Sequence, residues 1–122
     1  MKTRAGVCHE AGGSWQIEEV DIGEPHAHEV QVEMAYAGLC HSDEHVRRGE
    51  MVPAPEIMEL LGISSMFPLI GGHEGSGVVT AVGPEVATVE VGDKVATSFI
   101  PACGTCFWCA SGRQNLCDYG LY

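Results

Sequence analysis

Residues 103–117 read CGTCFWCASGRQNLC, which places four cysteines at the spacing Cys-x2-Cys-x2-Cys-x7-Cys. Four thiolates this close together repel one another and raise one another's pKa unless a multivalent cation binds them. Tetrahedral Zn²⁺ held by four cysteines is the most common structure of this kind. Cys103, Cys106, Cys109 and Cys117 would fill all four positions. We therefore expect a closed, structural site here and look for the chemistry elsewhere.

Two other interpretations of this cluster stay open, namely disulfides and an iron–sulfur centre. Residues 1–10 lack the apolar core of a signal peptide, so we expect a cytoplasmic chain whose thiols stay reduced. An iron–sulfur centre is the stronger alternative, because Cys-x2-Cys-x2-Cys also begins the bacterial ferredoxin pattern. Here the fourth cysteine comes only after seven residues and precedes Asp118 instead of a proline. The spacing therefore favours zinc.

Length and charge limit the fold class and the partners. The chain has 122 residues, 45% of them hydrophobic, which suits one domain with a modest core. Its formal net charge of −11 argues against nucleic acid as a partner, since phosphates require a basic surface. No apolar run is long enough to cross a bilayer, so we expect a soluble protein with no membrane partner.

Alternating polar and apolar residues predict a half-buried strand at residues 29–36, with Val30, Val32 and Met34 facing the core. Three further stretches rich in β-forming residues lie next to turn residues, at 14–20, 77–82 and 94–99. Short strands at regular spacing with few helices predict a mainly β domain, most simply a small barrel.

Two short helices are expected between the strands. The first covers residues 42–48, where Ser42 or Asp43 can cap the start and Gly49 can supply the left-handed residue after the end. The second covers residues 55–61. We interpret Arg47 and Arg48 as complements to the negative end of the first helix, with a phosphate contact as the alternative.

Several residues fit ordinary structural roles. Cys8 is expected to be a buried thiol, as free cysteines usually are. The histidines outside any motif are expected at the surface, and the bulky aromatic residues are expected to pack: His9, His26 and His28; Trp15, Phe107 and Trp108.

Two further motifs contain chemically active side chains: CHSDEH at residues 40–45 and GGHEG at residues 71–75. Each is weak evidence alone, because a single cysteine or histidine is usually a structural residue. Together with the cysteine cluster they resemble the zinc-containing medium-chain alcohol dehydrogenases. The match continues through GHEGSGVV at residues 72–79, through the turn and strand at 82–95, and through Gly104 and the tripeptide NLC at 115–117. The resemblance covers nearly the whole chain.

The resemblance implies a fold. It implies a GroES-like domain over residues 1–122, mainly β with short helices, in which a partly open barrel has a structural-zinc lobe at residues 101–118. It also implies that the chain stops before the family's dinucleotide-binding Rossmann domain, and no Gly-x-Gly-x-x-Gly pattern occurs in the sequence. The chain is similar to actinobacterial members that hold their nicotinamide cofactor tightly.

The resemblance also implies a second, catalytic zinc. Cys40 and His73 match two of its ligands, and Glu74 matches a neighbouring carboxylate that can approach the metal. Asp43 matches the carboxylate that orients the ligating histidine and raises its basicity. The family's third ligand, a cysteine, has no counterpart in these 122 residues.

Three side chains near Cys40 match residues that handle substrate, proton and cofactor. Ser42 matches the hydroxyl that hydrogen-bonds the substrate oxygen. His45 resembles the relay group that passes the proton towards solvent. His41 matches a position near the cofactor pyrophosphate, where the family often has a more basic residue.

The implied function is an enzyme that oxidises an alcohol to an aldehyde or ketone and transfers hydride to NAD. A small alcohol or aldehyde is the expected partner, the complete enzyme is expected to be a homo-oligomer, and the isolated chain is expected to be inactive. The alternatives are a non-catalytic zinc-binding GroES-like module and an iron–sulfur electron carrier. Residues 49–71 form a longer segment than most relatives have between the two motifs. We expect this segment to form a lid or narrow the substrate channel, with an ordinary surface excursion as the alternative.

Overall fold

The computed structural model describes residues 1–60, 62–100 and 102–118. Its strands form two three-stranded sheets, with the orders β2-β1-β4 and β3-β5-β6. The elements are β1 Lys2–Cys8, β2 Gln16–Asp21, β3 Val30–Ala37, α1 His41–Arg47, α2 Pro55–Leu60, β4 Leu69–Ile70, β5 Gly75–Val82, β6 Lys94–Ala96, α3 Phe107–Ala110 and the 3-10 helix η1 Gln114–Leu116. The predicted mainly β domain with short helices is confirmed, and its strands form two open sheets.

The first sheet is built on β1, which pairs antiparallel with β2 and, through Val7 and Cys8, with β4. Val7 and Cys8 are both buried, so the prediction of a buried thiol at Cys8 is confirmed. The sequence did not predict strand β1, because residues 2–6 show no regular alternation of polar and apolar residues.

The second sheet is built on β5, which pairs antiparallel with β3 along its whole length and with β6 over three residues. Val79 in β5 is almost completely buried, at 1% exposure. β6 ends at Ala96, short of the predicted Phe99. The Thr97 N–H still bonds to the Gly75 carbonyl at 2.8 Å, and the Thr97 hydroxyl bonds to the carbonyl of His73 in the loop before β5.

The expected inward orientation of β3 is wrong for two of its three residues. Val30 is 40% exposed and Met34 is 50% exposed, whereas Val32 is half-buried. The strand forms because its backbone pairs with β5. No second layer of the described residues covers these side chains, so alternation predicts the strand correctly and its burial incorrectly.

The helices also differ from expectation in detail. Cys40, with extended backbone, is the N-cap of α1, so Ser42 and Asp43 lie inside the first turn and do not cap it. Gly49 has the predicted positive φ, 79°, after the helix end. The second helix, α2, covers Pro55–Leu60, and the last residue of the predicted range, 61, lies outside the described residues.

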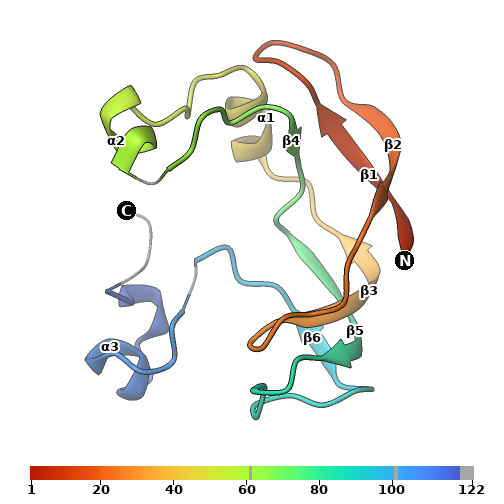
Figure 1. Ribbon diagram of the computed structural model, residues 1–122, viewed down its shortest axis with the longest axis vertical. Coiled ribbons are helices and arrows are strands. Elements are labelled where there is room, and N and C mark those ends of the chain that lie inside the picture. The colour runs from red at the N-terminus through yellow and green to blue at the C-terminus, as the bar shows by residue number, and fades with distance from the viewer. Residues whose placement is uncertain (61, 101, 119–122) are drawn as a thin grey trace.

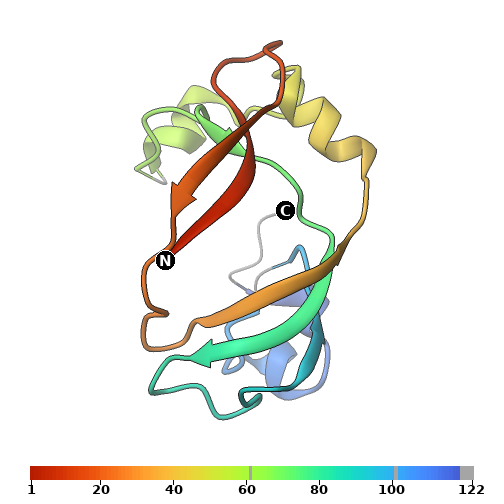
Figure 2. The ribbon, with the colours of Figure 1, turned by 90° about the vertical axis from the view of Figure 1, so that its right-hand side faces the viewer.

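The two sheets lie at opposite ends of the molecule (Figure 1). Helices α1 and α2 lie near the sheet of β1, and the segment containing α3 lies near the sheet of β5, as the view turned by 90° also shows (Figure 2). The chain between β4 and β5 connects the two ends. None of the helices in the described residues combines the length and apolar character that a bilayer-spanning helix needs.

Candidate metal centres and active site

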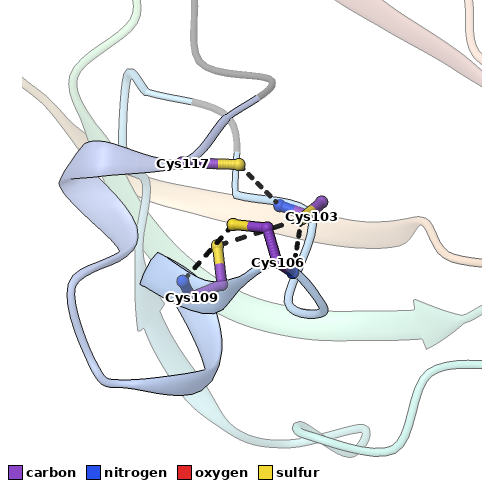
Figure 3. A group of neighbouring side chains, drawn as sticks. All are labelled: Cys103, Cys106, Cys109 and Cys117. Carbon is purple, nitrogen blue, oxygen red and sulfur yellow. Dashed lines mark hydrogen bonds between the residues drawn. The ribbon is translucent and has the colours of Figure 1, made fainter.

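The four cysteines predicted to bind structural zinc lie together at the end of the molecule that holds α3 (Figure 3). Their sulfur atoms all lie within 4.8 Å of one another. Tetrahedral coordination with Zn–S bonds of about 2.3 Å puts sulfurs about 3.8 Å apart. The distance from Cys103 Sγ to Cys109 Sγ is 4.0 Å, so the sulfurs are arranged nearly as zinc requires.

Local structure brings these sulfurs together. Cys106 is the N-cap of α3, Cys109 lies within that helix, and Cys117 directly follows η1. Backbone N–H groups donate to the sulfurs, from Cys103 to Cys117 Sγ at 3.3 Å, from Cys106 to Cys103 Sγ at 3.3 Å, and from Cys109 to Cys106 Sγ at 3.5 Å. Such N–H donors stabilise thiolates, which are the form that binds metal.

The electrostatics of the cluster also indicate a cation. The N–H of Cys106, with help from Thr105, lowers the pKa of Cys103 to about 6. Burial raises the pKa of Cys109 to about 12, so this thiol resists ionisation without a positive charge beside it. None of the six cysteines, all of which lie within the described residues, forms a disulfide. The donor set fits Zn²⁺ and leaves no ligand position for substrate.

The aromatic residues around this cluster divide between packing and exposure. Phe107 is 71% exposed, so the expectation that it packs is wrong, whereas its neighbour Trp108 is half-buried. The Phe107 and Trp108 rings meet edge to face at 5.2 Å between centroids.

A second group of donor atoms forms between α1 and β5. Cys40 precedes α1, and His73 and Glu74 lie in the loop between β4 and β5. Their donor atoms lie within 4.8 Å of one another, although more than thirty residues separate Cys40 from the other two. One thiol, one imidazole and one carboxylate can bind zinc and leave a fourth position open, as catalytic zinc sites do.

Asp43 holds the loop and the histidine in place. Its carboxylate accepts a hydrogen bond from the Gly72 N–H at 3.0 Å and one from His73 Nδ1 at 3.3 Å. The Asp43 carboxylate is the main reason that the pKa of His73 is raised. A proton held on Nδ1 leaves Nε2 available for a metal, which is the arrangement expected of an orienting carboxylate.

Ser42 lies beside the thiol on the first turn of α1. Its hydroxyl donates to Cys40 Sγ at 3.1 Å, and this bond is the main reason that the pKa of Cys40 is lowered. The hydroxyl therefore favours the thiolate, the form that coordinates metal. The same oxygen has lone pairs that can accept a proton from a substrate.

Two residues that position the loop of His73 and Glu74 were not predicted from the sequence. The Thr97 hydroxyl accepts from the Gly75 N–H at 2.9 Å and lies 3.0 Å from the carbonyl of His73, so it fixes both sides of the ligand loop. Gly38 donates its N–H to the Glu74 carbonyl at 2.9 Å. A Cβ on Gly38 would lie 2.2 Å from Glu74 Oε2, so only glycine leaves room for this carboxylate. The glycine at the end of β3 was the available signal.

The remaining predicted residues lie on α1. His45 Nδ1 is hydrogen-bonded to Glu50, and its ring meets the His41 ring edge to face at 4.8 Å. His41 is exposed at the start of the helix. Arg47 and Arg48 both pair with Glu44 on the same helix, each at 2.6 Å, and Arg47 also donates to the carbonyl of Gly13. Both arginines thus stabilise α1 through Glu44, and Arg47 also joins this helix to the loop after β1.

A cavity of about 240 Å³ opens beside Ser42 and His73. Its other walls are mainly apolar and include Val46, Met51, Met66, Leu69 and Phe99. The Phe99 ring also lies 5.2 Å from the His73 ring. A polar end next to candidate metal ligands and an apolar body are typical of sites for small organic molecules.

The structure is a mainly β domain with a cluster of four cysteines that could hold a zinc ion. The family described as "Alcohol dehydrogenase GroES-like domain" matches residues 26–122. The NDMA-dependent alcohol dehydrogenase of Amycolatopsis methanolica is 48% identical over 120 residues, which are 98% of this chain and 29% of that protein. The chain therefore belongs to the zinc-containing medium-chain alcohol dehydrogenase family, of which it contains the GroES-like domain.

Further relatives support the same family assignment. The S-(hydroxymethyl)glutathione dehydrogenase of Komagataella pastoris is 39% identical over 96% of this chain and 28% of its own length. The crystal structure of benzyl alcohol dehydrogenase from Acinetobacter calcoaceticus superposes with a TM-score of 0.77 at 32% identity, over 97% of this chain and 29% of that one. The chain thus spans less than a third of the length of these relatives.

Proposed function

We propose that this chain is the zinc- and substrate-binding domain of a dehydrogenase that oxidises an alcohol to an aldehyde or ketone and transfers hydride to NAD. The observation that supports this best is the meeting of Cys40, His73 and Glu74 beside a mainly apolar cavity. In this proposal residues 1–122 form one GroES-like domain, and the lobe at 101–118 holds a structural zinc.

Each residue of the site has a distinct task in this proposal. Cys40 and His73 hold the catalytic zinc, with Glu74 close enough to join or leave, and Asp43 keeps His73 in the metal-binding tautomer. When bound, zinc would act as a Lewis acid that makes a hydroxyl proton easier to remove. Ser42 would take up the proton of the substrate hydroxyl while it passes its own hydroxyl proton on towards His45, so that the serine ends neutral and the substrate ends as an alkoxide.

The proton has a route along α1. Ser42 and His45 are three residues apart on the helix and so lie on the same face. The His45 side chain is 43% exposed and is bonded to Glu50, so a proton that reaches this imidazole can pass to solvent. His41, exposed one turn earlier, would lie towards the pyrophosphate of NAD.

The remaining assignments concern the complete protein. Oxidation of an alcohol by hydride transfer requires a hydride acceptor, and NAD is proposed for this role from the family. A homo-oligomer is likewise proposed from the family. A cytoplasmic location is proposed because the clustered cysteines would bind zinc as reduced thiolates, which that compartment maintains.

Metal analysis of the purified chain tests the two zinc assignments. We expect two zinc ions per chain and a colourless protein, whereas an iron–sulfur cluster would colour it brown. Cys40→Ala should remove one zinc and retain the other, with Cys8→Ala, a cysteine outside both groups, as the matched control. A wild-type chain that holds a single zinc, unaffected by Cys40→Ala, would contradict the proposed catalytic centre.

Activity needs the dinucleotide-binding part of a dehydrogenase. We predict that the 122-residue chain alone does not reduce NAD⁺ with ethanol or benzyl alcohol. A chimera in which this chain replaces the matching segment of the Amycolatopsis methanolica enzyme should oxidise an alcohol, and Ser42→Ala should lower kcat by about a hundredfold or more, the usual contribution of a proton-transfer group. An active Ser42→Ala chimera at full rate would refute the role of Ser42.

A further inference from the structure

The segment at residues 49–71 supplies one wall of the cavity beside Ser42 and His73, through Met51 and Met66. We propose that Met66 limits the bulk of the alcohol that enters this cavity and so determines substrate specificity. The inference rests on the proposed function and adds the residue that selects the substrate. It also gives a role to residues 49–71, for which the sequence alone allows either a lid or channel wall or an ordinary surface excursion.

The chemistry of the cavity defines the class of ligand. Its polar end presents the Ser42 hydroxyl and the His73 ring, whereas Val46, Leu69 and the two methionines are apolar. Its volume of about 240 Å³ is below the range of roughly 300–1,000 Å³ typical of sites for drug-sized ligands. The ligand that fits is a small molecule with one hydroxyl or carbonyl and a compact apolar body.

Charge narrows the class further. The described residues that line the cavity include no lysine or arginine, and their one carboxylate, from Asp43, already accepts hydrogen bonds from Gly72 and His73. A carboxylate or phosphate on the substrate would lose its hydration here without gaining a cationic partner. The cavity therefore favours uncharged alcohols.

Met66 is held more firmly than Met51. The Ser65 hydroxyl accepts from the Phe67 N–H at 3.0 Å and donates to the Phe67 carbonyl at 2.7 Å, which fixes the turn around Met66. Three residues after Met66, Leu69 begins β4 and pairs with Cys8 of β1. Met66 is half-buried, whereas Met51 is 51% exposed and can move outwards. A fixed side chain sets the size of a pocket better than a mobile one.

Methionine methyl groups report on this cavity directly. The chain has five methionines, of which Met51 and Met66 line it, while Met58 lies in α2 beside a different hollow. We would label the methyl groups with ¹³C and titrate the zinc-loaded chain with benzyl alcohol, following their NMR shifts. The Met66 and Met51 signals should shift together and saturate, and the Met58 signal should stay in place. An unshifted Met66 signal, or equal shifts of all five, overturns the inference.

Substitutions test the limit on substrate bulk. Met66→Ala should raise the affinity for 2-naphthylmethanol relative to benzyl alcohol about tenfold, the lower end of what small changes in an apolar pocket produce. Met66→Leu preserves volume and should leave this ratio unchanged, which separates pocket size from general loss of folding. Met58→Ala, in the same segment but outside the cavity, is the matched control. Equal ratios in Met66→Ala and Met58→Ala overturn the inference.

A zinc-free arm separates this inference from the function on which it rests. If benzyl alcohol binds equally well with and without zinc while Met66 still shifts, the cavity assignment stands and the proposed catalytic centre fails. If binding requires zinc but Met66 neither shifts nor affects the ratio, the catalytic centre stands and the inference about Met66 fails. If no saturable binding occurs up to tens of millimolar, the inference about Met66 is overturned.

Discussion

The two groups of metal-binding side chains differ in how the chain assembles them. Cys103, Cys106, Cys109 and Cys117 come from one short segment, and backbone N–H groups of the same segment donate to their sulfurs. In the proposed structural site they would supply all four ligands of a zinc ion. Cys40 and His73 come from two distant segments and depend on the positions of α1 and of the loop before β5.

This difference separates stability from chemistry. A closed site made of local residues can fold with its metal as a unit, so its metal supports structure. A site made of residues that are distant in the sequence forms only when the surrounding fold has formed. Because its fourth ligand position is open, such a site can bind substrate from the adjoining cavity of about 240 Å³. Substitutions in the two groups should therefore have different consequences.

The largest effect is expected from Cys117→Ser. Structural zinc contributes on the order of 10 kcal/mol to the folding of small zinc domains, so the loss of one ligand should remove one zinc and lower the melting temperature sharply. Cys8→Ser is the matched control, because Cys8 and Cys117 are both 0% exposed and only Cys117 belongs to the cluster. Zinc content and thermal unfolding measure the difference. Equal destabilisation with unchanged zinc would show that the cluster does not bind metal.

Asp43→Asn should weaken metal binding at the group of Cys40, His73 and Glu74 without unfolding the chain. Loss of an orienting carboxylate typically weakens metal binding by about 10–100-fold. It should also lower the pKa of His73 in the metal-free chain, since the Asp43 carboxylate is what raises it. Competition with a chelator measures the affinity, and NMR titration of the ring measures the pKa. Asp93→Asn is the control, because that carboxylate also accepts a backbone N–H, from Glu90 at 2.9 Å, in a distant turn.

The same contrast explains what the sequence could predict. The cysteine cluster could be recognised from spacing alone, because its ligands are neighbours in the chain. The approach of Cys40 to His73 could be expected only from resemblance to a family, since no local pattern relates residues so far apart. Turn chemistry predicted a left-handed conformation for Gly49, whose φ is 79°.

Other features depend on tertiary packing and could not be predicted. The alternation in β3 identified a strand, but exposure of Met34 depends on whether another layer covers it, and alternation contains no such information. The strand expected to reach Phe99 ends at Ala96, and the bond from the Thr97 hydroxyl to the His73 carbonyl follows from no local pattern. The contribution of Met66 to the cavity depends on the turn fixed by Ser65 and on the pairing of β4 with β1.

A smaller effect is expected from Gly38→Ala. The new Cβ would lie 2.2 Å from Glu74 Oε2, so the carboxylate must move away from Cys40 and His73. We expect zinc affinity at this group to fall by about tenfold or less, which corresponds to at most about 1.4 kcal/mol. Gly6→Ala is the matched control, since a Cβ there meets nothing within 4 Å. If Gly38→Ala and Gly6→Ala bind zinc equally well, Glu74 does not contribute to the site.

The smallest effect is expected from a change within α1, the helix that begins directly after Cys40 of the candidate catalytic site. Hydrogen bonds from Arg47 and Arg48 lower the pKa of Glu44 from 4.5 to about 2. A carboxylate with a depressed pKa stabilises the fold fully above the pKa of the unfolded chain, and this contribution is lost as the pH falls from 4.5 towards 2.

Glu44→Gln should therefore lower the melting temperature slightly at neutral pH, and the difference from wild type should disappear as the pH approaches 2. The effect stays small because Glu44 and Arg48 are partly exposed and water screens their interaction. Glu56→Gln, which also changes an acidic residue in the first turn of a helix, is the control for helix-dipole effects. A pH-independent difference for Glu44→Gln would mean that shape, and not charge, accounts for the role of Glu44. In that case α1 would be held near the open site by the backbone bond from Gly12 to Arg47 and by packing.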